Sequence, residues 1–439
     1  MRCPQGVAES VRVSQNARGD SVAAWVEKGC GASGRVLAVS RTAGHPWGRV
    51  RTMGRTSADD VEVALDARGG ATLAWTRVED GDYYGQEAAI VVASRSPGRS
   101  FRRPRVLDKH GARPVLAGNA RGEEILAWKH LFLPVKSAHN GVMVAAIRGA
   151  RTARFAHPQA LSGPLAGTPI GSGAEESAVT DLQAAIAPDG AAVATWARAS
   201  GSGSRAVEAT MREPGGRFGS PLQVSDAVAS GNLASSAAIA DARDAIVAWT
   251  TNASDSQDGV FAARWNGQAF TAPTTLMSAQ GQAPGALFFD LHALLSRRGT
   301  ATLWWDDHTG CLAAGDYVIA TLPLSGPSGA PRPATPPNTT TGSFAATLDR
   351  QDRVVKAWST GRTIETDRYG NCRFESTELQ WSINDGPTFA GPASGPRWFQ
   401  TQAFAADPGP PTIIWQNHGR LLMMTLDQSG STSTSTPTS

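Results

Sequence analysis

One pattern of apolar and polar positions recurs along the 439 residues of the chain. Each copy has a short apolar strand, a turn containing Asp, Asn or Gly, a second apolar strand, and then a tryptophan. The copies read NARGDSVAAW, DARGGATLAW, NARGEEILAW, APDGAAVATW, ADARDAIVAW, SRRGTATLWW, DRQDRVVKAW and DPGPPTIIW, and they end at Trp25, Trp75, Trp128, Trp196, Trp249, Trp305, Trp358 and Trp415. Because most of these tryptophans are about fifty to sixty residues apart, the pattern indicates a repeat architecture.

Two more strands follow each tryptophan in most copies. The third is a period-two apolar segment such as VLAVSR, AIVVASR or VMVAAIR. The fourth places an aromatic residue, a proline and an aliphatic residue three positions apart, as in Phe101, Pro104 and Leu107. Since proline is tolerated at a sheet edge, this strand is expected to lie outermost. Each repeat is therefore predicted to be a four-stranded antiparallel sheet, one blade of an all-β propeller.

The number of repeats and the two chain ends predict how the ring closes. Eight tryptophans predict eight blades over residues 1–428, but the eighth repeat stops after its third strand, LLMMTL. Pro4 and Val7 have the spacing of a fourth strand, so the N-terminal segment is expected to complete the last blade and close the ring. Residues 429–439, rich in Ser and Thr, are predicted to be a disordered tail. Repeats six and seven match the fourth-strand pattern poorly, which leaves seven blades as the alternative.

The most regular residues of the repeat have structural explanations. A large flat side chain at the same position of every blade suits packing between blades, where a tryptophan buries ~150–250 Å². The Asp, Asn and Gly residues of the turns suit hairpins, because they adopt positive φ or cap the turn with a side chain.

Composition narrows the possible partners. Hydrophobic residues make up 41% of the chain, and 47 Gly and 27 Pro indicate many tight turns. A net charge of only +3, with both signs interspersed, argues against nucleic acid as a partner. No apolar run approaches the ~18 residues of a membrane span, and residues 1–10 lack the apolar segment of a signal peptide. We expect a monomer that is extracellular or at the cell surface, with the cytoplasm as the open alternative.

The repeat resembles bacterial secreted β-propeller repeat proteins, which are loosely similar in architecture to sialidases and WD-repeat proteins. The likeness covers almost the whole chain and implies the fold and export, but not an activity. The sialidase Asp-box, Ser-x-Asp-x-Gly-x-x-Trp, is absent because the step from Gly69 to Trp75 is too long. Sialidases also use a tyrosine nucleophile, whereas the tyrosines here lie outside the inner-strand copies, at Tyr83, Tyr84, Tyr317 and Tyr369.

Polar residues just after the tryptophans form the candidate binding surface. In a propeller these segments share one face with the links between blades, so they should ring one mouth of the central channel. Their mixed charge suits a polar ligand such as a glycan. The candidates are Arg77, Glu79, Lys129, His130, Arg198, Asp306, Asp307, His308 and His418.

The segment WWDDHTGC at residues 304–311 contains the closest grouping of side chains that could take part in catalysis. Asp306, Asp307 and His308 could act as acid and base or bind a metal. Adjacent residues of an extended segment point in opposite directions, however, and one cluster lacks the further ligands that a metal needs. No metal or cofactor is therefore predicted. Asp290 and His292, in the preceding inner strand of the same repeat, could approach the cluster.

Four cysteines offer a disulfide framework. Cys311 could bridge to Cys372 in the neighbouring repeat, and Cys3 could pair with Cys30 across the proposed closure. Both pairs would indicate an oxidising compartment. Unpaired buried thiols are the alternative.

Three functions are compatible with these features. The leading expectation is an exported, non-catalytic scaffold that binds a protein or a carbohydrate through the loop face. The alternative is a glycan-cleaving enzyme, a hydrolase or lyase, that uses carboxylates of the 304–311 loop. The third is a structural surface repeat protein.

Overall fold

The structure is a computed structural model, and it describes most of the repeat pattern. The described residues are 7–28, 34–56, 60–78, 88–131, 141–150, 152, 154–162, 179–199, 204–228, 232–252, 258–278, 287–308, 316–325, 328–336, 341–349, 351–366, 372–384, 386, 388–390, 401–404, 412–417, 420–426 and 432–435. Within these ranges every regular element is a β-strand.

The described strands form eight four-stranded antiparallel sheets, each from consecutive strands. The first four sheets contain β1 (Val7–Gln15), β2 (Ser21–Lys28), β3 (Gly34–Arg41), β4 (Arg51–Thr56); β5 (Val61–Leu65), β6 (Ala71–Arg77), β7 (Ala89–Arg95), β8 (Arg105–Asp108); β9 (Gly111–Gly118), β10 (Glu124–Leu131), β11 (Gly141–Arg148), β12 (Gln159–Ala160); and β13 (Val179–Ile186), β14 (Ala192–Ala199), β15 (Arg205–Arg212), β16 (Leu222–Gln223). The last four contain β17 (Asn232–Asp241), β18 (Asp244–Asn252), β19 (Gly259–Trp265), β20 (Thr274–Ser278); β21 (Leu287–Leu295), β22 (Ala301–His308), β23 (Asp316–Leu322), β24 (Arg332–Pro333); β25 (Thr341–Leu348), β26 (Val354–Thr366), β27 (Cys372–Ile383), β28 (Phe389–Ala390); and β29 (Thr401–Phe404), β30 (Thr412–Asn417), β31 (Arg420–Leu426), β32 (Thr432–Ser435).

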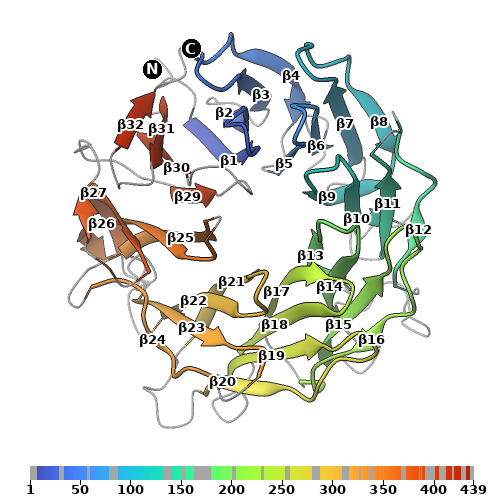
Figure 1. The fold of residues 1–439 in the computed structure, drawn as a ribbon, viewed down its shortest axis with the longest axis vertical. Coiled ribbons are helices and arrows are strands. Elements are labelled where there is room, and N and C mark those ends of the chain that lie inside the picture. The colour runs from blue at the N-terminus through green and yellow to red at the C-terminus, as the bar shows by residue number, and fades with distance from the viewer. Residues whose placement is uncertain are drawn as a thin grey trace.

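The sheets stand side by side in a ring, with the first strand of each nearest the centre (Figure 1). β29 of the last sheet contacts β1 of the first, so the ring is closed by packing between these two sheets. This arrangement confirms the prediction of an all-β propeller. The fourth strands lie at the outside and are short, and Pro104 and Pro158 come just before β8 and β12, as expected for edge strands.

The chain ends differ from the sequence-based expectation. The N-terminal segment was expected to add the last strand of the ring, but Val7 instead pairs with Lys28 and extends β1 of the first sheet. The fourth strand of the last sheet is β32, in which Ser435 pairs with Met423 of β31. This strand lies inside the predicted disordered tail. Alternating Thr and Ser have enough β-propensity to pair along the exposed edge of β31, so the last sheet needs no exchanged strand.

The repeat tryptophans lie on the second strands, and six of them pack between sheets, as predicted; the described neighbours of Trp25 belong to its own sheet, and the side chain of Trp415 is outside the described residues. Trp75, Trp128, Trp196, Trp305 and Trp358 are among the largest fully buried side chains. Each contacts apolar side chains of the preceding sheet; Trp128, for example, packs with residues of β6 and β7. A ring of such contacts supplies the apolar burial that no single four-stranded sheet can provide.

The turns between the first and second strands link neighbouring sheets. Gly19, Gly69, Gly122, Gly190 and Gly299 have positive φ in these turns, which confirms the prediction that they are hairpin residues. Asn residues add a contact to the next turn: the Nδ2 group of Asn16 donates to the carbonyl of Asp66 at 3.0 Å, and that of Asn119 donates to the carbonyl of Ala187 at 3.1 Å.

Asn119→Ala is expected to lower the free energy of unfolding by about 1–3 kcal/mol, because the Asn119 side chain is buried and its partners would be left unpaired. Its Oδ1 also accepts from the backbone amides of Arg121 and Glu123 within its own turn. The control is Asn266→Ala, because exposed Asn266 accepts backbone amides in its own turn but makes no described contact to another sheet. Urea unfolding of the two variants measures the difference; equal losses would show that the contact between turns adds nothing.

Candidate active site on the inner strands

Four inner strands are distorted at the same position of the repeat. Ser10, Arg113, Asp181 and Asp290 have φ between +48° and +54°, and the pairing register of β1, β9, β13 and β21 shifts there. Each lies fifteen positions before a repeat tryptophan (Trp25, Trp128, Trp196 and Trp305). Positive φ is unfavourable for residues other than Gly, Asn and Asp, and bulges of this kind are common beside functional sites, where they change the direction of side chains.

Asp290 in β21 is the centre of a polar cluster. Its Oδ1 is 3.0 Å from Nε2 of His292, and its Oδ2 accepts a hydrogen bond of 3.3 Å from the hydroxyl of Tyr317 in β23. The side chains of Asp290 and His292 are about half exposed, at 48% and 50%. The His292 ring stacks on Trp304 with 5.1 Å between centroids. The imidazole is therefore held from two sides while it remains open to solvent.

The contacts within this cluster shift the pKa values of Asp290 and Tyr317 in opposite directions. Burial raises the pKa of Asp290, but the hydrogen bonds from His292 and Tyr317 and the charge of Arg12 outweigh it and leave this pKa below its ordinary value. Burial and the charges of Asp290 and Asp306 raise the pKa of Tyr317 well above its ordinary value. At neutral pH Asp290 is thus an anion, and Tyr317 is a protonated hydrogen-bond donor.

A second charged pair lies on the inner strands of the first two sheets. Nε of Arg12 in β1 donates to Oε1 of Glu62 in β5 at 3.2 Å. Burial raises the pKa of Glu62 above its ordinary value, despite the opposing charge of Arg12. The charge of Arg12 also lowers the pKa of Asp290, although β1 and β21 belong to sheets that are not neighbours in the ring (Figure 1). The charge of Arg12 therefore acts on both Glu62 and Asp290.

The predicted 304–311 cluster has a different local structure from the expected loop. Asp306 and Asp307 are strand residues of β22, paired with Phe289 and Phe288, and both are half-buried. Asp306 also pairs with Tyr317 and contributes its charge to the Asp290 cluster. β22 ends at His308, whose side chain lies outside the described residues. The predicted approach of Asp290 and His292 to this segment is confirmed by the register of β21 and β22.

Two other candidates that follow the tryptophans, His130 and Arg198, share a carboxylate with the buried tryptophan of their own repeat. His130 Nδ1 and Trp128 Nε1 both lie 2.7 Å from Oδ2 of Asp108. Arg198 and Trp196 likewise bind the carboxylate of Glu208. These contacts fix the tryptophans.

Lys129 is buried, and burial, with a smaller effect of Arg113, lowers its pKa to about 8. Arg77 is exposed at the end of β6. Glu79 and His418 lie outside the described residues.

The disulfide predictions concern residues that the structure does not describe. Cys3, Cys30 and Cys311 lie outside the described ranges, and Cys372 begins β27 without a described side chain. Both pairings remain predictions. Among the described residues, no three His, Cys, Asp or Glu side chains are grouped to hold a metal ion. No helix within those ranges is long and apolar enough to span a membrane.

The sequence contains a pattern that could have predicted the inner-strand residues of this site. Positions fifteen and thirteen residues before each tryptophan repeatedly carry charged or polar side chains on the inner strand, including Asp290 and His292 in the sixth repeat, Asp60 and Glu62 in the second, and Arg12 in the first. The role of Tyr317 had no such signal, because it lies on a third strand.

The chain matches no protein-family model, and no curated protein matches it. Its fold is similar to solved structures. An ulvan lyase of polysaccharide lyase family PL25 superposes with a TM-score of 0.50 at 10% identity, covering 96% of this chain and 94% of that one. The polysaccharide lyase Uly1 gives 0.48 at 9% identity, over 86% and 89% of the two chains. A Hadza microbial sialidase gives 0.39 at 13% identity, over 74% and 71%.

These comparisons support a fold class and, as a separate matter, favour one of the expected functions. At such low identity they show the fold, and together with the ring of antiparallel sheets they place the chain among β-propeller proteins. The leading expectation of a non-catalytic binding scaffold is contradicted by the ulvan lyase, which matches 96% of this chain and is named as a polysaccharide lyase. The alternative expectation, a glycan-cleaving enzyme, agrees better with this similarity.

Proposed function

We propose that the chain is a glycan-cleaving enzyme, a lyase or a hydrolase, in which His292 transfers the proton and Asp290 positions it. One observation carries the proposal: a bulged Asp290, with φ of +49°, holds one nitrogen of a half-exposed imidazole on the inner strand. A carboxylate–histidine pair of this kind is the usual arrangement of a general base. The fold shared with an ulvan lyase is the reason to test glycans first.

The hydrogen bonds define which nitrogen reacts. When Nε2 of the neutral imidazole carries the proton and donates to Asp290, Nδ1 keeps its lone pair and can accept a proton from substrate. Tyr317 is a positioning residue, because it donates to the other oxygen of Asp290 and is itself buried.

Glu62 and Arg12 supply complementary chemistry. A carboxyl group with a raised pKa can carry a proton to the departing oxygen, which makes Glu62 the candidate general acid. Arg12 provides a positive charge for negative charge that develops on a sugar carboxylate or on a leaving oxygen.

The remaining features of the proposal concern the whole molecule. Each four-stranded sheet is one blade, which makes an eight-bladed propeller and a single domain that includes β32. A role on polysaccharides suits an extracellular or cell-surface monomer. Any ligand contact made by Arg77, Lys129 or the other residues after the tryptophans would lie on the same face, because the second strands end where the inner strands begin.

The test is cleavage of a panel of polysaccharides that contains uronic acid, sulfated and neutral polymers. New reducing ends report cleavage by either mechanism, whereas only a lyase also produces an unsaturated sugar that absorbs ultraviolet light. His292→Ala is expected to reduce cleavage by about two orders of magnitude or more, because general acid–base groups contribute about 10²–10⁴-fold.

The matched control is His157→Ala, which removes an exposed histidine whose described contact is to the carbonyl of Pro158. It should leave the rate unchanged. A chain that cleaves no polymer in the panel, or a His292→Ala variant with the wild-type rate, would refute the proposal.

A further inference from the structure

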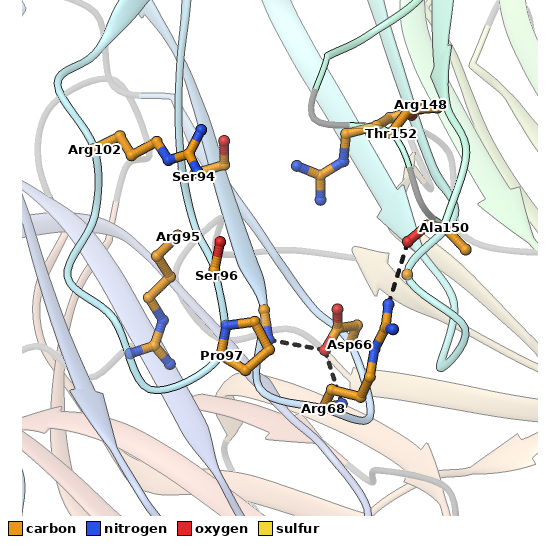
Figure 2. Close-up of a pocket in the computed structure, with 12 residues that line it drawn as sticks. Asp66, Arg68, Ser94, Arg95, Ser96, Pro97, Arg102, Arg148, Ala150 and Thr152 are labelled. Carbon is orange, nitrogen blue, oxygen red and sulfur yellow. Dashed lines mark hydrogen bonds between the residues drawn. The ribbon is translucent and has the colours of Figure 1, made fainter.

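A hollow of about 350 Å³ lies between the second and third sheets, at the ends of the strands opposite to Asp290. It is formed by the β5–β6 turn, the connection from β7 to β8, the β9–β10 turn and the segment after β11. Its volume falls at the lower end of the range of small-molecule sites. Figure 2 shows Arg95 and Arg102 on one side and Arg68 and Arg148 on the other, with Asp66 between them.

The charges in this hollow are only partly balanced by protein groups. Asp66 uses Oδ1 within its own turn, where it accepts the backbone amides of Arg68 and Gly70, each at 2.8 Å. Arg148 is hydrogen-bonded to the buried Glu124. Arg68 donates to the carbonyl of Ala150 at 3.2 Å and so joins the two sheets, but this partner carries no charge.

Arg95 and Arg102 have no carboxylate in hydrogen-bond contact among the described residues. The guanidinium of Arg95 lies 5.5 Å from the centroid of the Phe101 ring, and its buried Nε has no hydrogen-bond partner in the described part of the chain. The side chain of Arg102 is exposed and makes no described hydrogen bond or ion pair.

Equivalent arginines of other sheets show what a purely structural role looks like. Arg212, at the end of β15, donates to the carbonyls of Gly190 and Gly216. Arg264, near the end of β19, forms two hydrogen bonds of 2.8 Å with the carboxylate of Asp244. Both bind the protein through these groups, although Nη1 of Arg264, like Nε of Arg95 and of Arg148, is buried without a hydrogen-bond partner among the described residues. What sets the hollow apart is that Arg95 has no carboxylate in hydrogen-bond contact within the described part of the chain and lies beside the exposed Arg102.

We propose that this hollow binds an acidic saccharide, one that carries a sulfate or carboxylate group. The planar forks of arginine match the oxygens of such anions and form charge-assisted hydrogen bonds with them. The hydroxyls of Ser96 and Thr152, which also line the hollow, suit the neutral hydroxyls of a sugar. The site is separate from the cleavage site and does not depend on the proposed function.

The experiment is calorimetric titration of the His292→Ala chain, so that binding is measured whether or not the chain cleaves glycans. The probes are one sulfated oligosaccharide, its desulfated form, and inorganic sulfate. We expect the sulfated sugar to bind, the desulfated sugar to bind at least about tenfold more weakly, and added salt to weaken binding.

Arg102→Gln is expected to weaken binding by about tenfold, and Arg95→Gln by a similar factor, because each removes a charged hydrogen-bond donor. Arg102 is exposed, so its variant should fold normally even if Arg95→Gln does not. Arg55→Gln removes an exposed arginine of β4 and should not change the affinity. Equal binding of sulfated and desulfated sugars, no effect of Arg102→Gln, or inorganic sulfate binding as tightly as the sulfated sugar would overturn the proposal.

Discussion

Asp290→Asn should lower the rate of glycan cleavage by about two to four orders of magnitude without a comparable loss of stability. Asparagine tolerates positive φ, so the bulge can be retained. Its amide, however, has one acceptor oxygen in place of two, and both Asp290 oxygens now accept hydrogen bonds, from His292 and Tyr317. At least one of these two bonds must be lost or reversed in direction, and the imidazole also loses its negative partner.

Asp352→Asn is the matched control. Asp352 is also an aspartate with positive φ, at +60°, but it lies in the turn between β25 and β26, at the opposite end of the sheets. We expect the wild-type rate from this variant. Steady-state rates, with thermal unfolding of each variant, separate activity from stability. If Asp290→Asn cleaved glycans at the wild-type rate, His292 would not depend on Asp290 and the proposed dyad would be wrong.

Trp196→Ala is expected to lower the free energy of unfolding by about 3–5 kcal/mol, the range for removing a large aromatic side chain from a core. Trp196 is fully buried and packs with Ile125 and Met143 of the preceding sheet. Its Nε1 also donates to Oε2 of Glu208 at 2.8 Å, so the variant leaves this carboxylate with fewer partners.

Trp25→Ala provides the comparison at the same position of the repeat. Trp25 is only partly buried, so its loss should be smaller. Denaturant unfolding followed by circular dichroism measures both variants. Equal losses would mean that stability follows the repeat position and not the burial of each tryptophan.

Much of the fold could be predicted because the information is local and repeated. Alternating apolar residues, turns rich in Asp, Asn and Gly, and a tryptophan on each second strand indicate short antiparallel strands that must stack to bury their faces. The position of proline just before outer strands such as β8 was also readable, since proline cannot donate a hydrogen bond within a sheet. The function was predicted less well. Nearly every conspicuous residue has a structural role in the repeat, so residues with another role, such as Asp290 and His292, do not stand out in the sequence.

The sequence by itself determined the sheets, their order and the tryptophan packing, because each depends on residues within one repeat or on a feature common to all repeats. Only the tertiary structure decided how the ring ends and which side chains meet. β32 pairs with β31 because an open strand edge accepts any extended segment within reach, which the composition of the tail did not reveal. Asp290, His292 and Tyr317 come together through a bulge and the pairing of three strands. Arg12 acts on the same group from a distant sheet, because a closed ring turns the inner strands of all repeats toward one axis.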